Sequence, residues 1–495
     1  MTTATKEPLS YGNWTRPRSA GLFGLTYATS MTGLGLIIVS FFVLLFLGPV
    51  PGAVFTVGWF LCMVPLVIRI DGRTGYELMI VRRMFASARR KRETIYHSGP
   101  FSQVPGGTYL LPGTLAPSKL YAAQSAGGFD FGLVHIPRTH HFTVVFKCFP
   151  QGDEAIEQDT VDSFVWQWGR FLAVLGQSGD IVGATAVIES VPETGKTLAN
   201  EVDLITRSDA HPLARAIMTE SAALLPQDRV GLNARLALTF KATTAERRKD
   251  PSEQANEIAR RLPGILQGLS DAGVSAKPMT PPEIVAFVRR AYDPASLRNL
   301  EDGAVERGGH GVAWEDAGPG MANEGFRDYQ HDGVRSVTWE MSAAPTGAVN
   351  ERVLRRLLAP TEDVPWKRVA IVFRPHSAAE AVSIVDSDFK DAVAAEQSGR
   401  GVASAAASLR VAATSQARKE EARGHGLVRF GLLITASEKD DAEMPRMSST
   451  VEDLATQARL RVRRCHGFQA AAFAAALGCG VILPEHSTIS PMLSN

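Results

Sequence analysis

The sequence has little cysteine and no excess of charge of either sign. Its 495 residues include four cysteines, with 52 basic residues against 51 acidic ones. The cysteines form no C-x-x-C pair, which argues against a disulfide scaffold or a zinc module and predicts reduced thiols in a cytoplasmic compartment. The balanced charge gives no global field to attract nucleic acid, so we expect no sequence-specific nucleic-acid binding. A chain of this length predicts two or three domains.

The sequence also lacks a complete catalytic or nucleotide-binding motif. The nearest candidate is the stretch Ser190 to Thr197, SVPETGKT. A phosphate-binding loop begins with a glycine where this chain has Ser190, and Pro192 removes one backbone donor. Gly195, Lys196 and Thr197 therefore stay as weak candidates for cofactor binding, and a Gly-Lys turn after a strand is the better interpretation. We expect no catalytic residue, no cofactor and no enzymatic activity.

Three histidines lie close together in the sequence, at His135, His140 and His141. Neighbouring residues of a strand point to opposite faces, so His140 and His141 cannot easily bind one metal ion. We interpret these residues as ordinary surface histidines and predict no metal site.

Charge is absent from Ser19 to Ile68, a stretch long enough for two apolar helices. The run Gly48 to Gly52 contains two prolines, which favour a turn. The stretch predicts a two-helix transmembrane hairpin over residues 22–70. A signal peptide or a buried hairpin of a soluble protein are the alternatives. Because basic residues flank the hairpin on both sides, we expect a multi-pass protein of the inner, cytoplasmic membrane with both termini in the cytoplasm.

Hydrophobic periodicity after the hairpin predicts two α+β units. Alternation over His140–Phe149 is typical of a half-buried strand, and apolar residues at helical spacing predict a helix over Val161–Leu175. The order of strands and helices resembles the split βαβ of ferredoxin-like domains. The second half has the same order once an alanine-rich αα-hairpin is set aside. The expected fold is thus a membrane α-helical hairpin plus an α+β cytoplasmic region of two ferredoxin-like units.

These patterns divide the chain into six parts. The expected divisions are a cytoplasmic N-terminal segment (1–21), the transmembrane hairpin (22–70), a basic juxtamembrane helix and linker (71–124), a first α+β domain (125–292), a Gly-rich mobile linker (293–333) and a second α+β domain (334–495) with the αα-hairpin at 378–423.

Several short segments resemble one known family. They are Tyr11 to Arg18 (YGNWTRPR), Tyr96 to Pro100 (YHSGP), Arg289 to Pro294 (RRAYDP), Gln469 to Phe473 (QAAAF) and Ile482 to Pro484 (ILP). Together with the charge-free hairpin, they resemble the actinobacterial integral membrane proteins of integrative conjugative elements. Those proteins are similar to a small two-span type IV secretion subunit joined to the non-motor N-terminal part of the conjugative-transfer ATPase. The layout is also similar to that of EccE, the E component of type VII secretion.

The resemblance implies a non-catalytic, membrane-anchored structural subunit of a specialised secretion or conjugative DNA-transfer apparatus. Its expected partners are the lipid bilayer, the ATPase of the apparatus and other subunits, in a homo- or hetero-oligomer. The alternatives are a type VII component like EccE, a membrane-tethered NTPase using Lys196 and Thr197, and a free-standing receptor for a cytoplasmic protein.

The incomplete phosphate-loop motif leads to a direct prediction. Purified protein should hydrolyse no nucleotide at a rate that depends on Lys196, because the loop lacks its first glycine and one donor. A malachite-green phosphate assay on the wild type and on Lys196→Ala should give equal, background rates. An ATPase rate that Lys196→Ala abolishes would show the prediction to be wrong.

Overall fold

A computed structural model describes most of the chain and resolves it into two compact units. The described residues are 11–12, 14, 27–67, 69–70, 73–99, 110–125, 127–152, 156–195, 202, 205–207, 209–224, 229–306, 309–345, 347–397 and 405–486. One unit contains 94–381 and 424–486 together with the short segment at Tyr11, and the other contains the helices of 13–93 and of 382–423. Each unit is described by itself.

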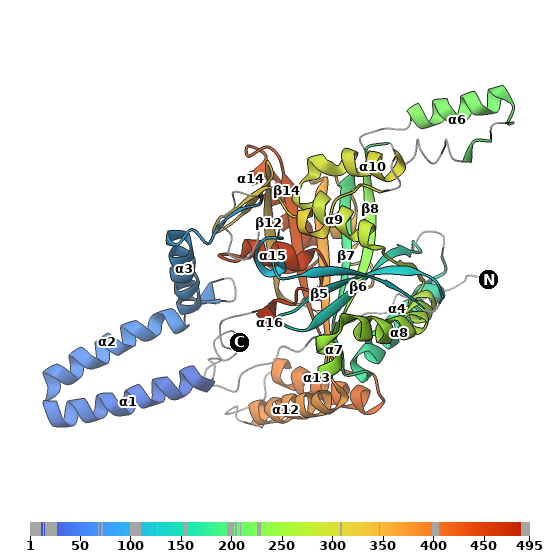
Figure 1. Cartoon of the computed structure of the whole chain (residues 1–495). Helices are drawn as coiled ribbons and strands as arrows, with labels where there is room; N and C mark the ends of the chain where they lie inside the picture. The colour runs from blue at the N-terminus through green and yellow to red at the C-terminus, as the bar shows by residue number, and fades with distance from the viewer. Residues whose placement is uncertain are drawn as a thin grey trace, which may run out of the picture. The chain divides into compact units, whose positions relative to one another are not determined.

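The first unit is built on one antiparallel sheet, which has 13 strands within the described residues (Figure 1). The strand order is β3-β10-β11-β12-β14-β13-β7-β8-β6-β5-β4, with β9 beside β6 and β15 beside β12. The strands are β3 (Ile95–His97), β4 (Lys119–Gln124), β5 (Asp130–Ile136), β6 (His141–Pro150), β7 (Ile181–Pro192), β8 (Val230–Lys241), β9 (Val274–Pro278), β10 (Met321–Glu324), β11 (Tyr329–His331), β12 (Val334–Ala343), β13 (Trp366–Pro375), β14 (Val428–Glu438) and β15 (Arg461–Arg464).

The two halves of this sheet repeat the same connections. In the first half the order across the sheet is β9-β6-β8-β7, and in the second it is β15-β12-β14-β13. Both are the split βαβ order, in which the first strand of the motif lies between the third and the fourth. The helices between these strands are, in the first half, α4 (Gln158–Gln177), α6 (Pro212–Leu224), α7 (Ala245–Lys249) and α8 (Pro251–Asp271). In the second half they are α11 (Arg355–Leu358), α12 (Ala378–Gln397), α13 (Ala405–Ala422) and α14 (Met444–Gln457). Pro263 lies within α8, which continues through it.

The halves meet where β7 pairs with β13. Seven residue pairs join these strands, from Lys367 opposite Ser190 to Phe373 opposite Ala184. The expectation of two separate ferredoxin-like units therefore needs correction, because the strands of both halves form one continuous sheet. Periodicity shows which face of a strand is buried, but it does not show which strand edges pair.

Helices cover both faces of the sheet and create the core. One face packs against α9 (Pro281–Tyr292) and α15 (Gln469–Ala476), and its core includes Val187, Ala370 and Phe473. On the other face, one cluster packs under α4 and α8 and another under α11 and α14. Thr280 and Glu283 form a capping box at the start of α9, so this helix begins at a fixed point above the sheet.

The segment 293–333 is ordered structure and not the Gly-rich mobile linker that its composition predicts. Its described residues form η3 (Pro294–Ser296), α10 (Leu297–Glu306), η4 (Trp314–Asp316) and the strands β10 and β11. Trp314, Tyr329 and His331 are buried in the core of the first unit. The glycines of this segment permit turns between its short elements, and its few large side chains are buried in the core.

Part of the expected juxtamembrane linker also belongs to the sheet unit. In the described part of 71–124, η2 (Gly113–Leu115) buries Leu115, and β3 and β4 are strands of the sheet. The basic helix of this segment is α3 (Gly75–Arg90), which follows the short pair β1 (Arg69–Ile70) and β2 (Arg73–Thr74).

Two helices, α1 (Tyr27–Leu47) and α2 (Pro49–Val67), form a hairpin in the second unit. Trp59 Nε1 donates to Ser40 Oγ across the pair at 2.5 Å. Gly52 allows the close approach, because a Cβ there would lie 2.8 Å from Leu44. Large apolar side chains such as Phe46 and Val50 remain exposed.

The prediction that this hairpin spans a membrane is overturned. Across the part of the chain that the structure describes, no helix has both the length and the apolar character needed to cross a bilayer. The expected transmembrane fold class, and the expected multi-pass location with both termini in the cytoplasm, are corrected accordingly. The absence of charge predicted the two helices, but it does not by itself establish that they cross a membrane.

Candidate functional site

The most unusual polar site of the sheet unit is a buried carboxylate that three arginines share. Glu189 Oε2 accepts from Arg235 Nη1 and from Arg290 Nη2, both at 2.7 Å. Its Oε1 accepts two hydrogen bonds from Arg368, from Nε at 3.0 Å and from Nη2 at 2.7 Å. The Glu189 side chain is 4% exposed, and those of the arginines are 4–16% exposed. We call these four residues the Glu189 cluster.

Strand register brings the cluster together at the junction of the two halves. Glu189 on β7 lies directly opposite Arg368 on β13. On the other side of β7, Arg235 of β8 lies opposite Val187, two residues from Glu189 and on the same face. Arg290 comes from the last turn of α9, which covers this face. The cluster therefore ties together two strands of the first half, one strand of the second and a covering helix.

The cluster carries more positive than negative charge. Three guanidinium groups face one carboxylate, and no second carboxylate contacts them among the described residues. Burial by itself would raise the pKa of Glu189, but the charges of Arg235, Arg368 and Arg290 together hold it well below its usual range. Burial lowers the pKa of Arg368 despite its pairing with Glu189.

Aromatic rings cover two of the arginines. The guanidinium carbon of Arg235 lies 4.2 Å from the centre of the Phe287 ring of α9, and that of Arg368 lies 5.3 Å from the Phe473 ring of α15. The face of an aromatic ring attracts a cation, most strongly where water is excluded. The two equivalent helices of the halves thus each place one ring on this cluster.

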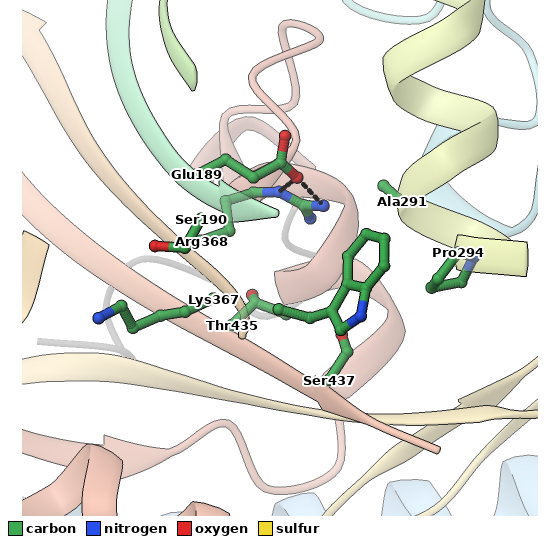
Figure 2. A pocket seen from close by; sticks show the side chains of 9 residues that line it. Glu189, Ser190, Ala291, Pro294, Lys367, Arg368, Thr435 and Ser437 are labelled. Carbon is green, nitrogen blue, oxygen red and sulfur yellow. Dashed lines mark hydrogen bonds and ion pairs between the residues drawn. The ribbon is translucent and has the colours of Figure 1, made fainter. Parts of the chain in front are cut away.

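A small cavity adjoins the cluster (Figure 2). It is lined by Glu189, Ser190, Ala291, Pro294, Trp366, Lys367, Arg368, Thr435 and Ser437. Figure 2 shows the Arg368 guanidinium turned toward the Glu189 carboxylate, with the hydroxyl-bearing Thr435 and Ser437 along the next strand. The volume of about 10 Å³ is room for roughly one water molecule. An organic substrate would not fit this cavity.

Lys367 is a further buried cation beside the cavity. It is 2% exposed, and its Nζ donates to the carbonyl oxygen of Ala359 at 2.7 Å. Burial lowers its pKa to about 8. Its strand neighbour Arg368 points to the opposite face of the sheet, so the two cations are separated by the sheet itself.

The structure describes only part of the expected phosphate loop. Ser190 and Pro192 lie within β7, and Gly195 has a positive φ of 75°. The Thr194 hydroxyl donates to Glu301 of α10. Lys196 and Thr197 lie outside the described residues, so their part in nucleotide binding stays a prediction.

Two of the three histidines predicted to be at the surface are buried. His135 and His141 are 7% and 0% exposed, and burial lowers the pKa of each to about 4. His140 is the turn residue between β5 and β6, with a φ of 55°. No group of three or more His, Cys, Asp or Glu side chains could bind a metal ion within the described part of the chain. Its cysteines Cys148, Cys465 and Cys479 are buried.

The segment Arg289 to Pro294 supplies much of the site. Arg290 binds Glu189, Ala291 and Pro294 line the cavity, and Arg289 bonds Asp293 at 2.8 Å. The Tyr292 carbonyl bonds His331 Nδ1. The sequence signal for this segment was its likeness to a family motif.

Sequence reasoning missed the remaining members of the Glu189 cluster. Glu189, Arg235 and Arg368 each lie in a strand that consists mostly of apolar residues. A charged residue within such a strand is the signal that could have found them, because buried charges are normally paired.

Comparison with known proteins covers only a small part of the chain. Residues 18–77 match a family described as a domain of unknown function (DUF8461). No curated protein matches the chain. The match covers the α1–α2 hairpin and the start of α3, and the Glu189 cluster lies outside it.

The buried histidines predict a loss of stability in mild acid. Their pKa is about 4 in the folded chain against about 6.5 when unfolded, so the unfolded chain takes up protons first as the pH falls. Each of His135, His141 and His331 should cost up to about 3 kcal/mol of unfolding free energy once the pH is below both values. Urea unfolding between pH 7 and pH 4 measures this loss.

His135→Phe should reduce the number of protons taken up on unfolding by up to one. The unfolding free energy should therefore depend less steeply on pH. The His135 ring stacks on Phe142 with centroids 4.0 Å apart, and neither of its nitrogens has a hydrogen-bond partner. Phenylalanine can keep the stacking without titrating. Replacing the exposed His425 by Phe is the matched control. An unchanged slope in His135→Phe would contradict the assignment.

The Glu189 cluster should be essential for the stability of the sheet. Glu189→Ala leaves three buried guanidinium groups without a carboxylate, and we expect a loss of about 3–5 kcal/mol of unfolding free energy. Asp363→Ala is the matched control. It breaks the pair of Asp363 and Arg446, whose side chains are 51% and 68% exposed, and it should cost under about 1 kcal/mol. Equal losses in the two variants would disprove a special role for the cluster.

Proposed function

We propose that this chain is a non-catalytic structural subunit that docks the ATPase of a specialised secretion or conjugative DNA-transfer apparatus. The observation that carries the proposal is the pair α12 (Ala378–Gln397) and α13 (Ala405–Ala422), inserted between neighbouring strands of the sheet. The short segments that resemble the non-motor part of the conjugative-transfer ATPase support the choice of apparatus.

The inserted helices are not needed to build the sheet. Strands β13 and β14 pair along their whole length, up to Pro375 opposite Val428. Just beyond, the backbone N–H of His376 donates to the Leu427 carbonyl at 2.9 Å. A turn of two to five residues is enough to connect such strands. The chain places two long helices there instead, which favours a role outside the sheet.

The two inserted helices hold each other in place. Arg418 Nε bonds Asp386 at 2.8 Å, and the Arg418 guanidinium lies 4.7 Å from the Phe389 ring centre. Near the other end of the pair, Ser408 donates to Glu396 at 2.8 Å. A helix pair with its own cross-links is suited to present a defined surface to another protein.

Some apolar side chains of the α12–α13 pair are buried inside the protein, and others are exposed. Val385 and Ala392 are buried, whereas Val382 on α12 and Leu409 on α13 are 47% and 71% exposed. The small side chains around them allow another helix to approach closely. This surface is the proposed contact with the ATPase.

Deleting the inserted helices tests the proposal. Residues 382–423 would be replaced by a short Gly/Ser linker, since these residues lie in a compact unit apart from the sheet. We expect the shortened protein to unfold cooperatively, with a circular dichroism spectrum that lacks only the signal of the removed helices, while losing co-purification with the ATPase of the apparatus. Normal affinity for the ATPase after the deletion would rule out this contact.

A point variant sharpens the test. Leu409→Asp should reduce ATPase binding at least tenfold, because the charge would have to be desolvated in the contact. Leu213→Asp is the matched control, since Leu213 of α6 is also highly exposed, at 63%. Surface plasmon resonance with the purified ATPase measures both. Equal effects of the two variants would argue against a localised contact.

A further inference from the structure

The Glu189 cluster has a feature that its own ion pairs do not explain. Four buried guanidinium nitrogens have no hydrogen-bond acceptor, namely Arg235 Nε and Nη2, Arg290 Nε and Arg368 Nη1. Arginine carries five donors in a fixed plane, and one carboxylate cannot accept from all the donors of three arginines.

Nearby groups that could ionise do not supply the missing negative charge. The charges of Arg235 and Arg368 favour the Cys479 thiolate, but burial outweighs them and raises the pKa of Cys479 to about 12. Burial likewise raises the pKa of Tyr292 far above its ordinary value. Both side chains are therefore neutral near pH 7. The described residues of the cluster leave two positive charges without a counter-ion.

Buried charge of this kind is costly unless it is compensated. The low dielectric of a protein interior strengthens the repulsion among the three guanidinium groups. The rings of Phe287 and Phe473 offset part of this cost. A bound anion would reduce the repulsion further and accept from donors that now have no acceptor.

We propose that the cavity beside Glu189 binds one halide-sized monovalent anion, with chloride as the physiological ligand. Arg368 lines this cavity, and its side chain is 7% exposed. A halide is only slightly larger than the roughly one water molecule that a volume of about 10 Å³ accommodates. Phosphate, sulfate and carboxylate ligands are too large. The anion completes the charge balance where the two halves of the sheet join.

The test measures unfolding as a function of chloride at constant ionic strength, with sodium gluconate replacing sodium chloride. A ligand that binds only the folded chain stabilises it in proportion to the logarithm of its concentration above Kd. We expect the urea midpoint of the full chain to rise with chloride and with bromide, and not with gluconate. A midpoint that does not depend on the halide overturns the proposal.

Two substitutions with opposite expected effects on the halide dependence of the urea midpoint test where the anion binds. Arg290→Gln removes one excess cation and should reduce the halide dependence. Glu189→Gln removes the competing carboxylate and should make it steeper. Arg446→Gln, which alters only the exposed ion pairs of Arg446 with Asp363 and Glu443, should leave the dependence as in the wild type. Equal halide dependence in all four proteins indicates general salt effects and overturns the proposal, and the wild-type titration decides even if a variant fails to fold.

Anomalous scattering from bromide-soaked crystals identifies the site directly. A bromide peak within hydrogen-bond distance of Arg368 Nη1, together with the halide-dependent midpoint, supports the proposal. A peak without any effect on unfolding means an adventitious ion only and contradicts it. This outcome is separate from the proposed ATPase contact, which no step of this experiment measures.

Discussion

The structure of the sheet unit depends on the pairing of β7 with β13 and on the buried carboxylate at that junction. Glu189 binds arginines from β8, β13 and α9 at once. Each of these contacts is strong only because the site excludes water, and each would be costly if a partner were lost. The cluster therefore demands that both halves be docked before its charges are satisfied, which makes the two halves one cooperative unit.

The halves contribute to the junction in equivalent ways. Strands β7 and β13 occupy the same position in the two split βαβ orders, and helices α9 and α15 cover the same face. Phe287 and Phe473, one from each helix, lie over two of the arginines. The two halves share this order of elements, and the charged residues lie at the edge where the halves meet. Apolar packing supplies the remaining interactions on both faces.

The regular sheet also explains how an insertion can be tolerated. Strands β13 and β14 are hydrogen-bonded to each other as far as His376 and Leu427. A long segment between them therefore does not disturb the pairing. The α12–α13 pair has internal contacts of its own through Arg418. A stable sheet with a self-supporting insertion separates the part that provides stability from the part available for binding.

Local periodicity determined much of the secondary structure from sequence alone. The alternation over His140–Phe149 and the helical stripe of Val161–Leu175 correspond to β6 and α4, and the alanine-rich stretch corresponds to α12 and α13. These signals are local, since neighbouring residues decide which face of an element is apolar. The charge-free stretch likewise indicated the helices α1 and α2, although it did not establish that they cross a membrane.

Only the tertiary structure decided the joining of the sheet and the composition of the site. Glu189 lies 46, 101 and 179 positions from its three arginines, and register alone brings them together. The sequence likewise did not show that residues 293–333 form ordered structure, because that structure depends on the burial of a few large side chains by distant elements. Pairing of strand edges and sharing of a buried charge are long-range interactions, and no local pattern in a single sequence specifies them.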